Sequence, residues 1–426
     1  MKKLLASLLA GTMALTALGG LAACGGGDGN NGPELKVWAP NESINGYKAI
    51  ISQFKAKYPD YAKYNITFEA KAESTVQTAL GKDPSTGADV FFIPSDHLYK
   101  LYNRSVLQAL PDSYANTVKG RDEQFTYEFA TINDKIMAFP ATNDNGYFLY
   151  YDSTFFTNAE DLKSLDTIQA KAKEASKHVA FDYGDAYYVA SFFIGTGCTF
   201  DYADATMKKY DTTLDSPQGE AAITAYWNYF SAAKNGVAAS DAQVIVNADP
   251  VTGFKEGNYV AAVAGTWKWS EIKRQVPGAE NKIKTAVLPS FTDGTDTYDM
   301  GSFYGAKYCA VNALKSPDSI RASLALAEFL TSEEGQLARY NATNAGPSNK
   351  KLNAENETIK NDSILATYKA QVAKKGYVQH DQADGFWADT GILNPVKKIA
   401  TGVTTTLSDA ISELKSVAAS IKIDKT

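Results

Sequence analysis

Carboxylates and aromatic side chains recur in segments that directly follow predicted strands. The set comprises Glu42, Asp96, Asp144, Asp185, Tyr187, Trp267 and Trp387. An ionised carboxylate accepts strong hydrogen bonds from hydroxyl groups, and an aromatic ring packs against the apolar face of a flat ligand. A bound anion would instead require arginine clusters or helix N-termini. The combination favours an uncharged, hydroxyl-rich ligand such as a sugar.

Several of these residues also have a purely structural interpretation. Asp96 and Asp185 can act as N-caps of helices that follow strands. Trp267 and Trp269 alternate in the segment TWKW, so we expect one ring to face a core and the other a cleft. Trp387 follows Gly385-Phe386 and could anchor a C-terminal helix.

Composition and missing motifs exclude several classes of protein. The 426 residues carry a net charge of -6 and no basic block, so a nucleic-acid-binding surface is not expected. The chain lacks the GxxxxGK[ST], HExxH and GxSxG motifs of nucleotide-binding P-loops, zinc peptidases and serine hydrolases. With three His and three Cys residues and no CxxC pair, neither a metal site nor a cofactor is predicted. Cys198 and Cys309 either form a disulfide or remain two buried thiols, and we favour the thiols.

Apolar runs alternate with helical spacings along the chain. We expect strands at 35–38, 66–68, 88–93, 136–139, 147–151, 179–181 and 309–311, and helices at 47–58, 162–177, 219–233 and 320–330. The segment FKEGNYVAAVAGTWKWS, which begins at Phe254, is expected to form a turn, a strand and a loop. This order indicates an α/β fold of mostly parallel sheets flanked by helices. Ligands of such sheets bind beyond the C-terminal ends of the strands, where Asn41-Glu42-Ser43 and Ser95-Asp96-His97 follow two predicted strands.

The N-terminus has the features of an export signal. Lys2 and Lys3 precede an apolar stretch over residues 4–18, which predicts a signal peptide at 1–23. Leu21-Ala22-Ala23-Cys24 resembles the lipobox of bacterial lipoproteins, in which the cysteine is lipidated; the alternative is an ordinary cleavage site beside an incidental cysteine. The glycine-rich segment 24–33 is then a flexible tether. We therefore expect an exported protein held by lipid on the outer face of the cell membrane, in a Gram-positive bacterium.

An ordered set of short motifs resembles the maltodextrin-binding proteins of bacterial ABC importers. From residue 35 to about residue 417 the motifs are LKVW, NGY, GADVFFIPSDHL, AFPATNDN, FDYGDAYY, FKEGNYVAAVAGTWKWSEI, VLPSF, AEFLTSEEG and GFWAD. The resemblance implies the two-lobe periplasmic-binding-protein fold, with a hinge between the lobes and the ligand in the cleft. It implies an N-terminal lobe at 34–140 and 290–335 and a C-terminal lobe at 141–289 and 336–426. The hinges would lie near 140–143 and 287–290, with a third crossing after 332–335.

The resemblance also assigns sugar contacts to this chain. It implies acidic contacts at Glu42, Asp96, Asp144 and Asp185, stacking at Tyr187, Trp267 and Trp387, and further polar contacts at Glu73, Asn41 and His97. Three positions depart from the family pattern. Ser43 and His97 replace basic residues of the enteric members, and Ile93 replaces an aromatic residue. The wall of the first lobe is therefore less basic and less aromatic, so ligand length and linkage could differ.

The function implied by the resemblance is a monomeric, lipid-anchored receptor. It would capture maltodextrin by lobe closure and deliver it to the permease subunits of an ABC transporter, with the carboxylates acting as hydrogen-bond acceptors and not as catalysts. Two alternatives remain open at this point. One is a receptor for xylo- or cello-oligosaccharides, and the other is a glycoside hydrolase, which also places paired carboxylates in a sugar cleft.

Overall fold

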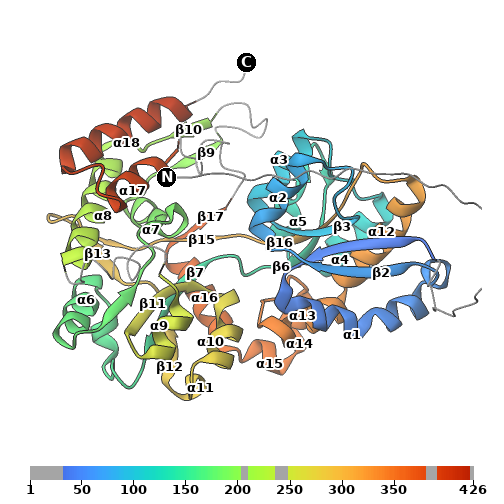
Figure 1. The fold of residues 1–426 in the computed structure, drawn as a ribbon, viewed down its shortest axis with the longest axis horizontal. Coiled ribbons are helices and arrows are strands. Elements are labelled where there is room, and N and C mark those ends of the chain that lie inside the picture. Colours follow the sequence, from blue (N-terminus) through green and yellow to red (C-terminus); the bar gives the residue numbers. More distant parts are fainter. Residues whose placement is uncertain (1–31, 203–209, 236–247, 380–390, 423–426) are drawn as a thin grey trace, which may run out of the picture.

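The computed structural model describes residues 32–202, 210–235, 248–379 and 391–422. The predicted signal peptide, Cys24, most of the tether and Trp387 lie outside these ranges. The described elements form two lobes side by side (Figure 1). Each lobe has a sheet flanked by helices, which confirms the predicted two-lobe α/β architecture.

The sheet of the first lobe combines strands from distant parts of the sequence. Its order is β2 (Asn65–Ala70), β1 (Glu34–Ala39), β3 (Val90–Pro94), β16 (Lys307–Val311) and β6 (Phe139–Thr142). Strand β1 runs parallel to β2 and β3, whereas β16 runs antiparallel to both β3 and β6. Every residue of β3 is buried, as its continuous apolar run predicts. The sheet is thus mixed, because β16 enters it in the opposite direction.

Helices α1 (Asn41–Lys57) and α13 (Glu333–Thr343) pack against each other in the first lobe. Helix α1 begins directly after Pro40 and buries Ile44, Tyr47, Ile50 and Phe54, the spacing of one helical face. Gly46 makes the close approach of the two helices possible. A methyl group at position 46 would lie only 2.7 Å from the carbonyl oxygen of Ala338 in α13.

The sheet of the second lobe has apolar side chains on both faces. Its order is β12 (Ile283–Ala286), β7 (Tyr147–Asp152), β11 (Tyr259–Gly265) and β8 (His178–Ala180). Tyr147 and Leu149 of β7 face one core, while Phe148 and Tyr150 face another. One core lies under helices that include α7 (Ala186–Thr196), α8 (Pro217–Asn235) and α18 (Leu407–Ile421). The other lies under α9 (Pro250–Glu256), α10 (Trp269–Gln275) and α16 (Ser363–Lys375).

The remaining described helices and strands complete the two lobes and the segments between them. They are α2 (Glu73–Lys82), α3 (Leu98–Asn103), α4 (Asp112–Arg121), α5 (Gln124–Phe129), β4 (Thr131–Ile132), β5 (Lys135–Ile136), α6 (Leu165–Glu174), β9 (Phe200–Tyr202), β10 (Tyr210–Thr212), α11 (Ala279–Lys282), β13 (Ser290–Thr292), β14 (Thr297–Asp299), β15 (Ser302–Tyr304), α12 (Pro317–Leu330), α14 (Lys350–Glu355), α15 (Glu357–Lys360), β17 (Gly376–Val378) and α17 (Leu393–Ala400). The predicted strand at 136–139 is divided between β5 and β6.

The chain crosses between the lobes at three places. The first crossing connects β6 with β7, close to the predicted hinge at 140–143. The second connects β15 with β16, later than the predicted 287–290, because Leu288, Phe291 and Phe303 all pack in the core of the second lobe. The third follows α15, later than the predicted crossing after 332–335, since α13 packs on α1 and α16 packs on β7. The second and third boundaries predicted between the lobes are therefore earlier in the sequence than the positions at which the chain changes lobe.

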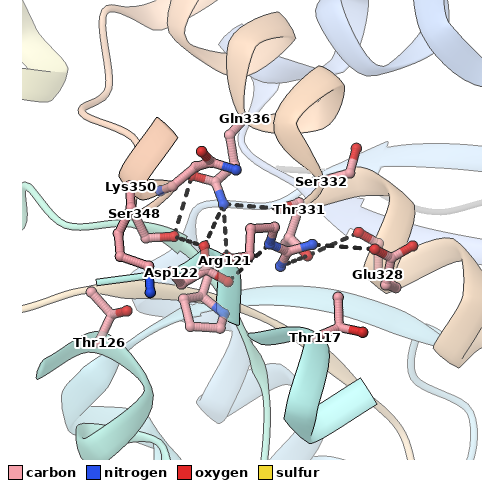
Figure 2. Close-up of polar contacts among 12 residues, drawn as sticks. Thr117, Arg121, Asp122, Thr126, Glu328, Thr331, Ser332, Gln336, Ser348 and Lys350 are labelled. Carbon is pink, nitrogen blue, oxygen red and sulfur yellow. Dashed lines mark hydrogen bonds and ion pairs between the residues drawn. The ribbon is translucent and has the colours of Figure 1, made fainter. Parts of the chain in front are cut away.

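A buried polar network holds the segment after α13 on the first lobe (Figure 2). Asp122 accepts hydrogen bonds from Ser348 Oγ at 2.7 Å and Gln336 Nε2 at 2.9 Å through Oδ1, and from Arg121 Nε at 3.0 Å through Oδ2. Arg121 also donates to Glu328 of α12. Burial raises the pKa of Asp122, while Arg121 opposes that shift. These contacts explain why residues up to Asn349 stay with the first lobe.

The two described cysteines are free and lie in different lobes. Cys198 is buried in the core of the second lobe and Cys309 in that of the first. The interpretation as two buried thiols is confirmed. None of the described helices combines the length and apolarity needed to cross a membrane.

Candidate functional site

A cavity of about 600 Å³ lies between the lobes, beyond the C-terminal ends of β1 and β3. It is lined by eight residues that the sequence analysis singled out: Asn41, Glu42, Glu73, Asp96, His97, Asp185, Tyr187 and Trp267. Further lining residues that it did not name include Lys71, Ser74, Asn145, Tyr188, Lys307 and Gln379. Residues far apart in the sequence therefore meet in one place.

Asp96 and His97 carry polar atoms that have no partner within the described protein. They lie in a 3₁₀ turn that follows β3, and Asp96 is only 9% exposed. Among the described residues, no group hydrogen-bonds to Asp96 Oδ1 or His97 Nδ1. Burial lowers the pKa of His97, so the imidazole is neutral near pH 7. Because a buried polar group without a partner is costly, these atoms favour a ligand with hydroxyl groups.

Asp185 combines the two interpretations that the sequence left open. It is the N-cap of α7, since its Oδ1 accepts a hydrogen bond from the backbone N–H of Tyr187 at 2.9 Å. Its side chain also lines the cavity. Burial raises the pKa of Asp185, and the hydrogen bond from Tyr187 works in the opposite direction. The capping bond fixes the carboxylate at the N-terminus of α7, where it faces the cavity.

Aromatic rings form the wall of the second lobe. The ring of Tyr187 stacks on Phe303, with centroids 5.5 Å apart, and lies 6.4 Å from Trp267. Trp269 instead packs in a core, stacked on Tyr150. The expectation that one tryptophan of TWKW faces a cleft and the other a core is confirmed. A side chain at Gly265 would overlap the indole of Trp267, so the glycine lets this ring lie against the end of β11.

Asp144 does not line the cavity. Its side chain is buried, and Oδ2 accepts hydrogen bonds from Thr266 Oγ1 at 2.7 Å and from the backbone N–H of Gly346 at 2.6 Å. Asp144 thus connects the first crossing with the end of β11 and with the segment after α13. Because these two donors hold Oδ2, Asp144 serves as an anchor beside Trp267, and a sugar contact at this position stays a prediction.

Glu73 lines the cavity but is engaged by two cations. Its Oε2 pairs with Lys307 Nζ at 2.9 Å, and its Oε1 pairs with Arg339 Nη2 at 2.7 Å. Burial alone would raise the pKa of Glu73, but Lys307 and Arg339 outweigh burial and lower it to about 2. Glu73 therefore stays ionised at neutral pH and orients Lys307. The sequence offered little signal for Lys307, since it is a single cation before an apolar strand.

Gln379 and Asn145 line the cavity and are joined by a hydrogen bond. Asn145 Nδ2 donates to Gln379 Oε1 at 2.7 Å, and Ser95 Oγ donates to the backbone carbonyl of Gln379 at 2.9 Å. A methyl group at Gly305 would lie 2.7 Å from Ser95 Oγ, so a side chain here would displace the Ser95 hydroxyl from its present position. Segments from both lobes are joined at this point by hydrogen bonds.

Comparison with known families decides the class of protein. The family described as bacterial extracellular solute-binding protein matches residues 49–367, well over half of the chain. The chain belongs to this family. No curated protein matches the chain in sequence.

Solved structures share the fold of this solute-binding protein. One, with acarbose, is 22% identical and has a TM-score of 0.77, and the match covers 92% of this chain and 99% of that chain. The maltodextrin-binding protein MalE1 from L. casei BL23, without ligand, is 24% identical with a TM-score of 0.74, covering 92% and 99%. A cyclo/maltodextrin-binding protein complexed with maltotetraose is 22% identical with a TM-score of 0.67, covering 92% and 98%. These likenesses establish the two-lobe fold.

The chemistry of the cavity of this solute-binding protein is that of hydrogen bonding and stacking. Across the described ranges, no group of three or more His, Cys, Asp or Glu residues could hold a metal ion. The cavity offers carboxylates from both lobes, a neutral imidazole and a wall of aromatic rings. Such a set can bind a ligand that combines flat apolar faces with many hydroxyl groups.

Proposed function

We propose that this protein is a receptor that binds a neutral oligosaccharide between its lobes and delivers it to the permease of an ABC transporter. One observation carries the proposal: the cavity brings Asp96 of one lobe together with Asp185, Tyr187 and Trp267 of the other. Within the described residues, one carboxylate oxygen of Asp96 has no hydrogen-bond partner. Sugar hydroxyl groups would donate to the carboxylates, and sugar rings would stack on the aromatic side chains.

Maltodextrin is the proposed ligand. The resemblance of the sequence supports it, and so do the names of the solved structures, which mention maltodextrin, maltotetraose and acarbose. A receptor for xylo- or cello-oligosaccharides is the alternative. In either case the sugar would contact both walls only when the lobes close, so binding would favour the closed arrangement.

The protein is further proposed to be exported and anchored by a lipid on Cys24, with residues 24–33 as a tether. Support comes from the lipobox-like sequence and from membership of an extracellular family. A lipid and a flexible tether would keep the receptor near its importer in a Gram-positive cell. A Cys24→Ser variant should then be found in the medium instead of the membrane fraction.

Titration of tryptophan fluorescence against maltotriose, xylotriose and cellotriose tests the proposed ligand. Maltotriose is expected to change the emission, because Trp267 lines the cavity.

The same titration tests the role of Asp96. Asp96→Ala should weaken binding by about tenfold to a hundredfold, which corresponds to the free energy of hydrogen bonds to a charged acceptor. Glu174→Ala, an exposed change on α6 away from the cavity, should bind like the wild type.

Two outcomes of this experiment would overturn the proposal. A response to xylotriose or cellotriose with none to maltotriose would replace maltodextrin by another glycan. Steady release of shorter sugars from maltotriose would replace the receptor by a glycoside hydrolase, since the carboxylates are proposed to act only as acceptors.

A further inference from the structure

We infer that Lys307 is a positioning residue of the cavity, which holds the ring of Trp267 from the opposite lobe and so sets the affinity for sugar. Lys307 is the first residue of β16 in the first lobe, and Trp267 follows β11 in the second. Both line the cavity. The effect on sugar affinity rests on the proposed function, whereas the contact between Lys307 and Trp267 is present in the protein without sugar.

The ammonium group of Lys307 is held in place by buried charges. The Lys307 side chain is 12% exposed and pairs with Glu73, which is 10% exposed. Glu73 in turn pairs with Arg339, whose side chain is 4% exposed and lies against the ring of Phe92. Because α2, α13 and β16 each contribute one of these three charges, the position of Lys307 is determined by the packing of the first lobe.

From this position Lys307 reaches across to the aromatic wall. Its Nζ lies over the indole of Trp267, 5.1 Å from the ring centroid. A lysine ammonium at this range is attracted by the electrons of the ring, and tryptophan is the best partner for that interaction. The same indole lies against Gly265, which has no side chain to push it away. Trp267 is therefore confined by its own strand and by a cation of the other lobe.

Two consequences for binding follow from this contact. A sugar ring that stacks on an indole gains affinity when the indole is already fixed, because less side-chain freedom is lost on binding. The contact also joins the two lobes, so it forms only when they approach each other and favours the closed arrangement. Loss of Lys307 should weaken sugar binding, and it should do so through Trp267.

A double-mutant cycle tests this coupling, with the dissociation constant of maltotriose measured by calorimetry. Lys307→Met keeps the length of the side chain, removes its charge and leaves Glu73 paired with Arg339. It should weaken binding about tenfold in the wild type but less than about twofold when Trp267→Phe is already present. Lys307→Arg should restore most of the affinity, because a guanidinium can pair with Glu73 and stack on Trp267. Lys307→Gln serves the same cycle if the methionine variant does not fold.

Lys71 provides the matched control. It also lines the cavity, but its Nζ lies over Trp38, at 4.8 Å, and pairs with Glu69. The effect of Lys71→Met on binding should be the same with and without Trp267→Phe. If Lys307→Met also weakens binding by the same factor in both backgrounds, Lys307 does not act through Trp267 and the inference is wrong.

Fluorescence without sugar separates this inference from the proposed function. Lys307→Met should change the tryptophan emission of the free protein, and it should not do so in the Trp267→Phe background. If that signal is present but no glucan binds, the Lys307–Trp267 contact stands and the proposed ligand fails. If glucan binds and neither the emission nor the cycle shows coupling, the ligand stands and the role of Lys307 fails.

Discussion

At the scale of single residues, neighbouring carboxylates have different roles although the sequence presents them alike. Asp96 Oδ1 has no partner among the described residues, and Asp96 lines the cavity, whereas Asp144 does not line it and accepts hydrogen bonds from Thr266 and Gly346. Asp185 both caps a helix and lines the cavity. The number of protein donors around each carboxylate therefore distinguishes an anchor from a group that is free to bind a ligand.

Substitution of Asp144 separates stability from binding. Asp144→Ala removes the acceptor of the buried Gly346 N–H and leaves the Thr266 hydroxyl only its longer bond, 3.3 Å, to the backbone carbonyl of residue 144, which together should cost about 1–3 kcal/mol. Asp144→Asn retains one carbonyl oxygen and should cost less. Urea unfolding measures both changes. Folded Asp144→Asn should bind maltotriose within about threefold of the wild type, and a hundredfold loss would instead make Asp144 a direct sugar contact.

Much of the site was predictable at this scale from residue type and place. Asp96, Asp185 and Trp267 follow predicted strands, and the chemistry of their side chains points to a hydroxyl-rich ligand. Lys307 was not predictable, because its role depends on Glu73 and Trp267, which are far away in sequence. No local pattern encodes a contact of that kind.

At the scale of elements, the strand runs were predictable but the direction and grouping of the strands were not. The buried run of β3 is visible in the sequence, yet nothing local shows that β16 enters beside it in the antiparallel direction. The resemblance implied a third crossing after 332–335, but the chain leaves the first lobe later, after α15. Ser332 caps the N-terminus of α13, and this helix packs on α1 within the first lobe.

The packing of α13 on α1 depends on Gly46. Gly46→Ala places a methyl group 2.7 Å from the Ala338 carbonyl, so the helices must move apart, at a cost of about 1–3 kcal/mol in the free energy of unfolding. Gly120 of α4 is the matched control, because a methyl group there meets no atom within 4 Å. Gly120→Ala should stabilise the protein by about 0.5–1 kcal/mol. Thermal or urea unfolding of both variants checks the difference, and equal effects would contradict the close approach.

At the scale of the whole molecule, the cavity is a property of the two lobes together. Asp96 and Lys307 belong to one lobe, and Asp185, Tyr187 and Trp267 belong to the other. A hydrogen bond between Asn145 and Gln379, which also line the cavity, joins two of the segments near the crossings. The two-lobe architecture could be predicted from the order of the sequence motifs. The exact positions of the crossings could not be predicted. They depend on the core in which Phe291 packs and on the helix against which α13 packs.

The central claim is that a neutral glucan binds between the lobes and contacts both. A crystal structure of the protein with maltotriose tests it most directly. We predict the sugar in the cavity, with a hydroxyl group within hydrogen-bonding distance of Asp96 Oδ1 and a glucose ring stacked on Trp267. A sugar bound to only one lobe, or bound elsewhere with this cavity free of it, would contradict the account.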